Sequence, residues 1–150
     1  MITTFRRRAA AATAAAALAF GLVSCADDAG TSAEGNGATE TIQVEDNQGT
    51  QTVALPLDSV ISTDNRTFRT LEDWGVELSA APVGLMPENL GYKTDDSIVD
   101  LGNHREPNLE AIVAAEPDLI INGQRFAQYY GNIKALTPDT PILDVEVREG

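Results

Sequence analysis

The chain has 150 residues, of which 43% are hydrophobic and 22% are charged, a composition typical of one globular domain. Its formal net charge of −13 disfavours binding to nucleic acid or to an anionic membrane surface. The single cysteine excludes an intrachain disulfide bond, and any cluster of arginines in so acidic a chain is a candidate anion site.

Residues 1–24 have the pattern of an export signal. Three arginines, residues 6–8, precede an uncharged, alanine-rich run over 9–23 that has the length of a signal-peptide core and is short for a bilayer span. The run ends in Leu22-Val23-Ser24-Cys25, which resembles the lipobox of bacterial lipoproteins. The resemblance implies a lipid on Cys25 and an extracytoplasmic protein anchored to the cell membrane. The alternative is an ordinary secretory signal with a chance cysteine.

The next segment is a predicted tether followed by a hairpin. Residues 25–40 are small and polar, without a large apolar side chain, and are expected to be flexible. Residues 41–46 and 50–56 alternate apolar and polar side chains around Asn47-Gln48-Gly49, which predicts a β-hairpin at the start of a folded domain over 41–150.

Beyond the hairpin, short apolar strands alternate with helical segments. Strands are predicted at 60–62, 81–84, 98–101, 118–121 and 141–145. Helices are predicted at 66–74, 108–115 and 126–136, with Trp74 expected in the core. Repeated strand–helix–strand order predicts an α/β fold, a parallel sheet with flanking helices.

A parallel sheet also predicts where a ligand binds, because the loops that leave the carboxyl ends of its strands emerge along one edge. These loops are residues 63–65, 85–87, 103–105 and 123–125. Arg105 and Arg125 lie in two of them, and a pair of guanidinium groups on one rim is suited to hold an anion. The alternative is that each arginine pairs with a nearby acid such as Glu106 or Asp95.

Residues 100–121 resemble a signature of the iron-siderophore, haem and cobalamin binding proteins of ABC importers. In that family a glycine-led loop enters a short helix carrying Asn-Leu-Glu, and Pro-Asp-Leu-Ile-Ile follows, as at residues 108–110 and 117–121 here. Residues 71–76 and 82–85 also match, so the similarity covers about residues 53–147. It implies the N-terminal Rossmann-like lobe of a two-lobe, helical-hinge periplasmic binding protein, with the second lobe missing from this sequence.

The resemblance also implies a function and roles for single residues. The likeness is greatest to binders of catecholate siderophores, petrobactin among them, which carry basic residues at the positions of Arg105 and Arg125. The residue equivalent to Glu110 docks onto the membrane permease in that family. Leu109, Ile112 and Val113 form the expected buried stripe of its helix, which leaves Glu110 exposed. The expected activity is capture of a ferric siderophore by a monomer and its delivery to permease subunits, without catalysis.

Further ligand-binding candidates lie at the same edge. Met86 is expected to form a soft apolar wall of the site. One of Tyr129 and Tyr130 is expected to reach the ligand, and the other to pack against the domain. The candidates are Asn65, Met86, His104 and Tyr130. No cofactor or metal site of the protein's own is expected, because a siderophore saturates its iron.

Three alternatives to siderophore binding stay open. They are a haem binder with His104 or Met86 as axial ligand, a cobalamin binder, and a surface-tethered interaction module. A hydrolase is disfavoured because the chain has neither a Gly-x-Ser-x-Gly motif nor a second histidine.

Overall fold

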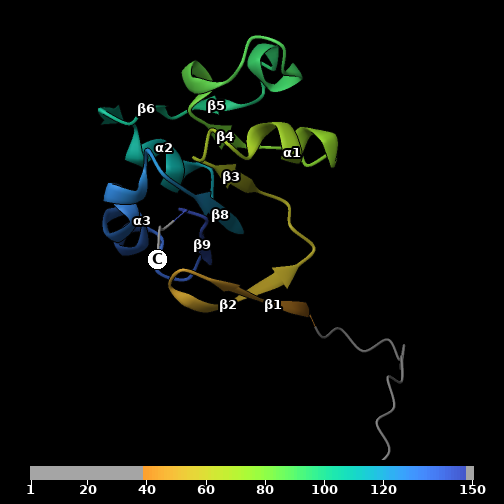
Figure 1. The fold of residues 1–150 in the computed structure, drawn as a ribbon. Coiled ribbons are helices and arrows are strands. Elements are labelled where there is room, and N and C mark those ends of the chain that lie inside the picture. The colour runs from red at the N-terminus through yellow and green to blue at the C-terminus, as the bar shows by residue number, and fades with distance from the viewer. Residues whose placement is uncertain (1–38, 148–150) are drawn as a thin grey trace, which may run out of the picture. The chain divides into compact units, whose positions relative to one another are not determined.

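The structure is a computed structural model that describes residues 39–147 (Figure 1). The predicted signal peptide, Cys25 and most of the predicted tether lie outside these residues. Within them, no helix has the length and apolar character needed to cross a membrane.

The domain begins with the predicted hairpin. β1 (Glu40–Asp46) pairs antiparallel with β2 (Gly49–Leu55), and Asp46 is the partner of Gly49 across the turn. Gly49 has a φ of 112°, a conformation that glycine adopts without steric cost. The turn is attached to the rest of the domain, because the Asn47 side-chain amide donates to the backbone oxygen of Asp144 at 3.0 Å.

The remaining strands form the predicted parallel sheet, with the order β5-β4-β3-β8-β9. The strands are β3 (Val60–Ser62), β4 (Ala80–Ala81), β5 (Val99–Asp100), β8 (Leu119–Asn122) and β9 (Ile142–Asp144). The chain moves outward in one direction from β3 to β5 and in the other from β8 to β9. The order therefore reverses between β3 and β8, and the loops at such a reversal form the crevice where α/β sheets bind ligands.

The helices are shorter than predicted. The α-helices are α1 (Phe68–Asp73), α2 (Leu109–Ala114) and α3 (Tyr130–Leu136). The 3₁₀ helices are η1 (Val83–Leu85), η2 (Gly91–Thr94) and η3 (Ala127–Tyr129). A small antiparallel hairpin pairs β6 (Gly102–Asn103) with β7 (Glu106–Pro107). The strand predicted over 81–84 ends at Ala81, because Pro82 has no N–H to donate to the ladder and the chain turns into η1.

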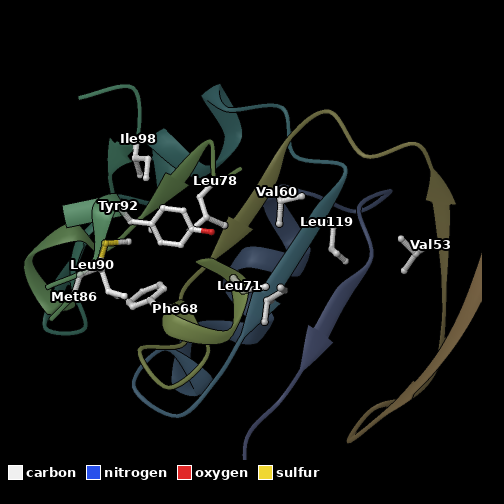
Figure 2. Close-up of a cluster of buried hydrophobic side chains, with 12 residues drawn as sticks. Val53, Val60, Phe68, Leu71, Leu78, Met86, Leu90, Tyr92, Ile98 and Leu119 are labelled. Carbon is white, nitrogen blue, oxygen red and sulfur yellow. The ribbon is translucent and has the colours of Figure 1, made fainter. Parts of the chain in front are cut away.

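Alternate residues of the central strands face two separate cores. Val60 and Leu119 belong to a cluster with Phe68 of α1, which Figure 2 shows together with Leu71, Met86, Leu90 and Tyr92. Their neighbours Ile61 and Ile120 belong to a second cluster with Ile112 of α2 and Ile133 of α3. Helices thus cover both faces of the sheet, α1 on one side and α2 and α3 on the other (Figure 1).

Three side chains lie elsewhere than predicted. Trp74 is 76% exposed, because α1 buries Phe68 and Leu71 and ends before Trp74. Val113 is 41% exposed, so the buried stripe of α2 is narrower than predicted and centres on Ile112. Met86, expected as a wall of the ligand site, is a core residue with 4% exposure and packs in the cluster of Phe68.

Candidate ligand-binding edge

The carboxyl edge of the sheet gathers the loops that carry most of the predicted site residues. The five strands are parallel, so the segments that follow β3, β4, β5, β8 and β9 all leave from this edge. Asn65 follows β3, Arg105 follows β5, and Arg125 follows β8. The backbone therefore gives these residues the common edge that the sequence predicted.

Arg105 lies at the tip of the β6–β7 hairpin. The hairpin requires glycine at position 102 in β6, where φ is 73° and a Cβ atom would lie 2.8 Å from the backbone oxygen of Glu106. The backbone N–H of Arg105 donates to the Asn103 side-chain oxygen at 2.9 Å. The local sequence thus forms a short, hydrogen-bonded tip with the arginine side chain exposed.

The tip is joined to the segment that follows Arg125. The backbone oxygen of His104 accepts a hydrogen bond from the Tyr129 hydroxyl at 2.9 Å and one from the Gln128 side-chain amide at 3.2 Å. Both donors lie in η3, which starts two residues after Arg125. The loops that carry the two arginines are therefore held side by side.

Neither arginine is neutralised by a nearby acid in the described part of the chain. The ion pairs among the described residues are Arg66 with Asp64 and Lys93 with Glu88. The side chains of Arg105 and Arg125 are both exposed. This contradicts the alternative in which each arginine pairs with Glu106 or Asp95. Two guanidinium groups therefore remain available to an anion.

A third arginine, Arg66, lies at this edge and was not among the predicted site residues. The Arg66 Nε lies 3.1 Å from Oδ1 of Asp64, whose side chain is 2% exposed, and its terminal nitrogen donates to the backbone oxygen of Val145 at 2.9 Å. Arg66 thus compensates a buried carboxylate and connects the loop after β3 to the segment after β9. The sequence did contain a signal for Arg66, because it lies just past the end of β3, as Arg105 and Arg125 lie past the ends of their strands.

The polar candidates Asn65, His104 and Tyr130 are all partly buried. The Asn65 side-chain oxygen and the His104 Nδ1 are buried and have no hydrogen-bond partner among the described residues. The pKa of Tyr130 is raised, first by burial of its hydroxyl and then by the carboxylates of Asp46 and Asp144. Tyr130 therefore lies on the side of the edge nearest the β1–β2 turn, and its hydroxyl stays protonated at neutral pH.

Glu110 occupies the first turn of α2 and is exposed, as predicted. The helix begins at Asn108, whose side-chain oxygen accepts from the backbone N–H of Ala111 at 3.1 Å. This cap satisfies one of the free N–H groups at the start of the helix. Because α2 follows β7, Glu110 lies toward the ligand-binding edge, and its carboxylate forms no ion pair within the described residues.

The described residues contain no group of three histidine, cysteine, aspartate or glutamate side chains that could hold a metal ion. A cavity of about 480 Å³ lies at the opposite, amino edge of the sheet. The charged residues of its wall are all acids, namely Asp58, Glu72, Glu77 and Asp95. Its charge does not suit an anionic ligand, so the basic loops at the carboxyl edge remain the candidate site.

These features define a class of protein: an open α/β lobe with a reversal of strand order and basic loops at its carboxyl edge, built to bind a solute. Residues 60–150 match the periplasmic binding protein family, and the chain belongs to this family.

Two relatives are named for the compounds that they bind. The chain is 27% identical over 95 residues to the petrobactin-binding protein YclQ of Bacillus subtilis, covering 62% of this chain and 30% of the relative. It is 29% identical over 108 residues to the ferric-anguibactin-binding protein FatB of Vibrio anguillarum, covering 71% and 33%. This chain thus spans about a third of the length of these relatives.

Solved structures have the same fold. The siderophore-binding protein BauB, bound to ferric iron and two acinetobactin molecules, matches with a TM-score of 0.61 at 28% identity, over 73% of this chain and 38% of that one. The structure of YclQ from Bacillus subtilis matches with a TM-score of 0.63 at 25% identity, over 72% and 38%. The fold predicted from the sequence is therefore confirmed.

Proposed function

We propose that this chain forms one wall of the ligand site of an ABC-importer binding protein, and that the ligand is an anionic ferric siderophore. The observation that carries the proposal is the pair of adjoining loops with Arg105 and Arg125, exposed and without acidic partners in the described residues. Support comes from YclQ, FatB and BauB, which bind petrobactin, ferric anguibactin and ferric acinetobactin. A second lobe would supply the opposite wall, and no cofactor of the protein's own takes part.

The binding proposal is tested in the full-length protein by titration with ferric catecholates, ferric hydroxamates and haem. Arg105→Ala and Arg125→Ala should each weaken binding of a ferric catecholate by about tenfold or more, because each removes a charged donor from an anion. Lys134→Ala is the matched control. It removes one positive charge at the amino edge, where Lys134 donates to the backbone oxygen of Thr140. Equal effects of all three changes, or preferential binding of haem, would overturn the proposal.

We also propose that the mature protein is a monomeric lipoprotein outside the cytoplasm, with its lipid on Cys25. The lipobox at residues 22–25 supports this placement, as does membership of a family of periplasmic binding proteins. Asn65, His104 and Tyr130 would add polar contacts around the siderophore. Metabolic labelling with a radioactive fatty acid tests the anchor, since Cys25→Ser should abolish both the label and recovery in the membrane fraction.

A further inference from the structure

The hairpin tip that carries Arg105 has few attachments of its own. The hairpin has two residue pairs, Gly102 with Pro107 and Asn103 with Glu106, and its tip has one internal hydrogen bond, from the Arg105 N–H to the Asn103 side-chain oxygen. In the part of the chain that the structure describes, the hydrogen bonds joining this tip to another element are those that the His104 oxygen accepts from Tyr129 and Gln128. The hydrogen bonding of this tip to other elements therefore depends on these two donors.

The donors are themselves fixed to the segment of Arg125. The N–H of Phe126 donates to the oxygen of Gly123, and the N–H of Tyr129 donates to the oxygen of Phe126, each at 2.8 Å. The Phe126 ring is fully buried and meets the Tyr129 ring edge to face, with centroids 6.0 Å apart. Residues 123–129 thus form one rigid turn that carries Arg125 and presents the Tyr129 hydroxyl to His104.

We propose that Tyr129 is a positioning residue that holds the Arg105 loop against the Arg125 turn, with Gln128 as a weaker second donor. The inference rests on the proposed anion-binding function. A guanidinium group on a loosely held tip would have to be ordered when the ligand binds, and that ordering would weaken binding. The bonds to His104 order the tip beforehand, so the two arginines are spaced for one anionic ligand before it arrives.

The test is Tyr129→Phe in the full-length protein, which keeps the ring and removes the hydroxyl. Tyr92→Phe is a matched control, because Tyr92 also donates its hydroxyl to a backbone oxygen, that of Val76, at the other edge of the sheet. Without ligand, amide hydrogen exchange of residues 103–106 should become faster in Tyr129→Phe and stay unchanged in Tyr92→Phe. The Kd for a ferric catecholate should rise about two- to tenfold in Tyr129→Phe, the range expected for one neutral hydrogen bond.

A double-mutant cycle separates positioning from general stability. In an Arg105→Ala background, Tyr129→Phe should no longer change the Kd, because the side chain that it positions is gone. Unchanged amide exchange at residues 103–106 in Tyr129→Phe would show that Tyr129 does not hold the Arg105 loop, whichever ligand the protein binds. A different result would separate the two proposals: Tyr129→Phe makes exchange faster but leaves the Kd unaltered, while Arg105→Ala weakens ligand binding. That result would overturn the positioning role of Tyr129 and leave the proposed function standing. A wild-type protein that binds no ferric siderophore would overturn both.

Discussion

Buried polar side chains distinguish the carboxyl edge of this sheet at the scale of single residues. Thr63, Asp64 and Asn122 are at most 1% exposed, and the Thr63 hydroxyl lies 2.8 Å from the Asn122 side-chain oxygen. Buried polar groups are stabilising only when their partners are placed well. The loops that begin here are therefore sensitive to small changes in packing.

Gly123 provides a sharp test of that sensitivity. A Cβ atom at this position would lie 2.6 Å from the Asp64 carboxyl carbon. Gly123→Ala should therefore lower the free energy of unfolding by about 1–3 kcal/mol, measured by chemical denaturation. Gly131→Ala is the control, since a Cβ there meets no atom within 4 Å and lies inside α3, where alanine stabilises a helix by up to about 1 kcal/mol. Equal stability of the two variants would contradict the close packing against Asp64.

Tyr92 predicts a dependence of stability on alkaline pH. Burial, followed by the negative charge of Glu72, raises the pKa of its hydroxyl above the ordinary value of 10.0. The unfolded chain loses this proton first as the pH rises, so the contribution to stability is complete below pH 10.0 and is lost as the pH passes through the raised folded-state pKa.

Denaturation midpoints at about pH 8 and about pH 10.5 measure this loss, which should be smaller in Tyr92→Phe because phenylalanine has no proton to lose. The variant is also expected to be less stable at pH 8 by about 1 kcal/mol, since it lacks the hydrogen bond to Val76. Identical pH dependence in the two proteins would contradict the assignment to Tyr92.

At the scale of elements, alternating apolar and polar residues predicted the hairpin, and short apolar strands between helical segments predicted the parallel sheet. The β6–β7 hairpin and η2 were missed, since two to four residues carry too little periodicity to be recognised. Trp74 and Met86 were misplaced for a different reason. Which apolar side chain fills a core depends on where a helix ends and how a loop folds back, and both are decided by tertiary packing.

The candidate site likewise combines features set by local sequence pattern with features set by tertiary packing. The common edge of Arg105 and Arg125 follows from the parallel direction of the strands, which the sequence predicted. The bonds from Tyr129 and Gln128 to His104 and the pairing of Arg66 with Asp64 depend on contacts between loops, and no local pattern specifies them.

The α2 helix carries a prediction about the permease. Glu110 lies exposed in its first turn, at the end nearer the ligand-binding edge, and Glu116 follows its last turn near the amino edge. Glu110→Gln should leave the Kd for the ferric siderophore unchanged and reduce cellular uptake of the iron complex by about tenfold, because it removes the charge that the family resemblance implies for docking on the permease. Glu116→Gln removes a charge from the opposite edge and should support normal uptake. Loss of ligand binding in Glu110→Gln would place this residue in the ligand site instead.

At the scale of the whole molecule, the five-stranded sheet of the described residues is covered by helices on both faces, and its carboxyl edge carries the basic loops proposed to meet a ligand. The siderophore-binding structure of BauB is matched over 38% of its chain. A ligand enclosed by one wall alone keeps much of its surface in water and forms fewer of its contacts. Affinity is therefore expected to depend on the second lobe as much as on the arginines.

Residues 26–150 alone should therefore bind a ferric catecholate at least about tenfold more weakly than the full-length protein. Titration calorimetry is the suitable measurement. Trp74, the only tryptophan of the chain, lies 76% exposed at the end of α1 that leads to the amino edge, so its fluorescence would report poorly on the carboxyl edge. Circular dichroism of the fragment provides the control that the lobe is folded when it is titrated. Equal affinities of a folded fragment and the full-length protein would mean that this single edge completes the site, and the two-wall arrangement would have to be abandoned.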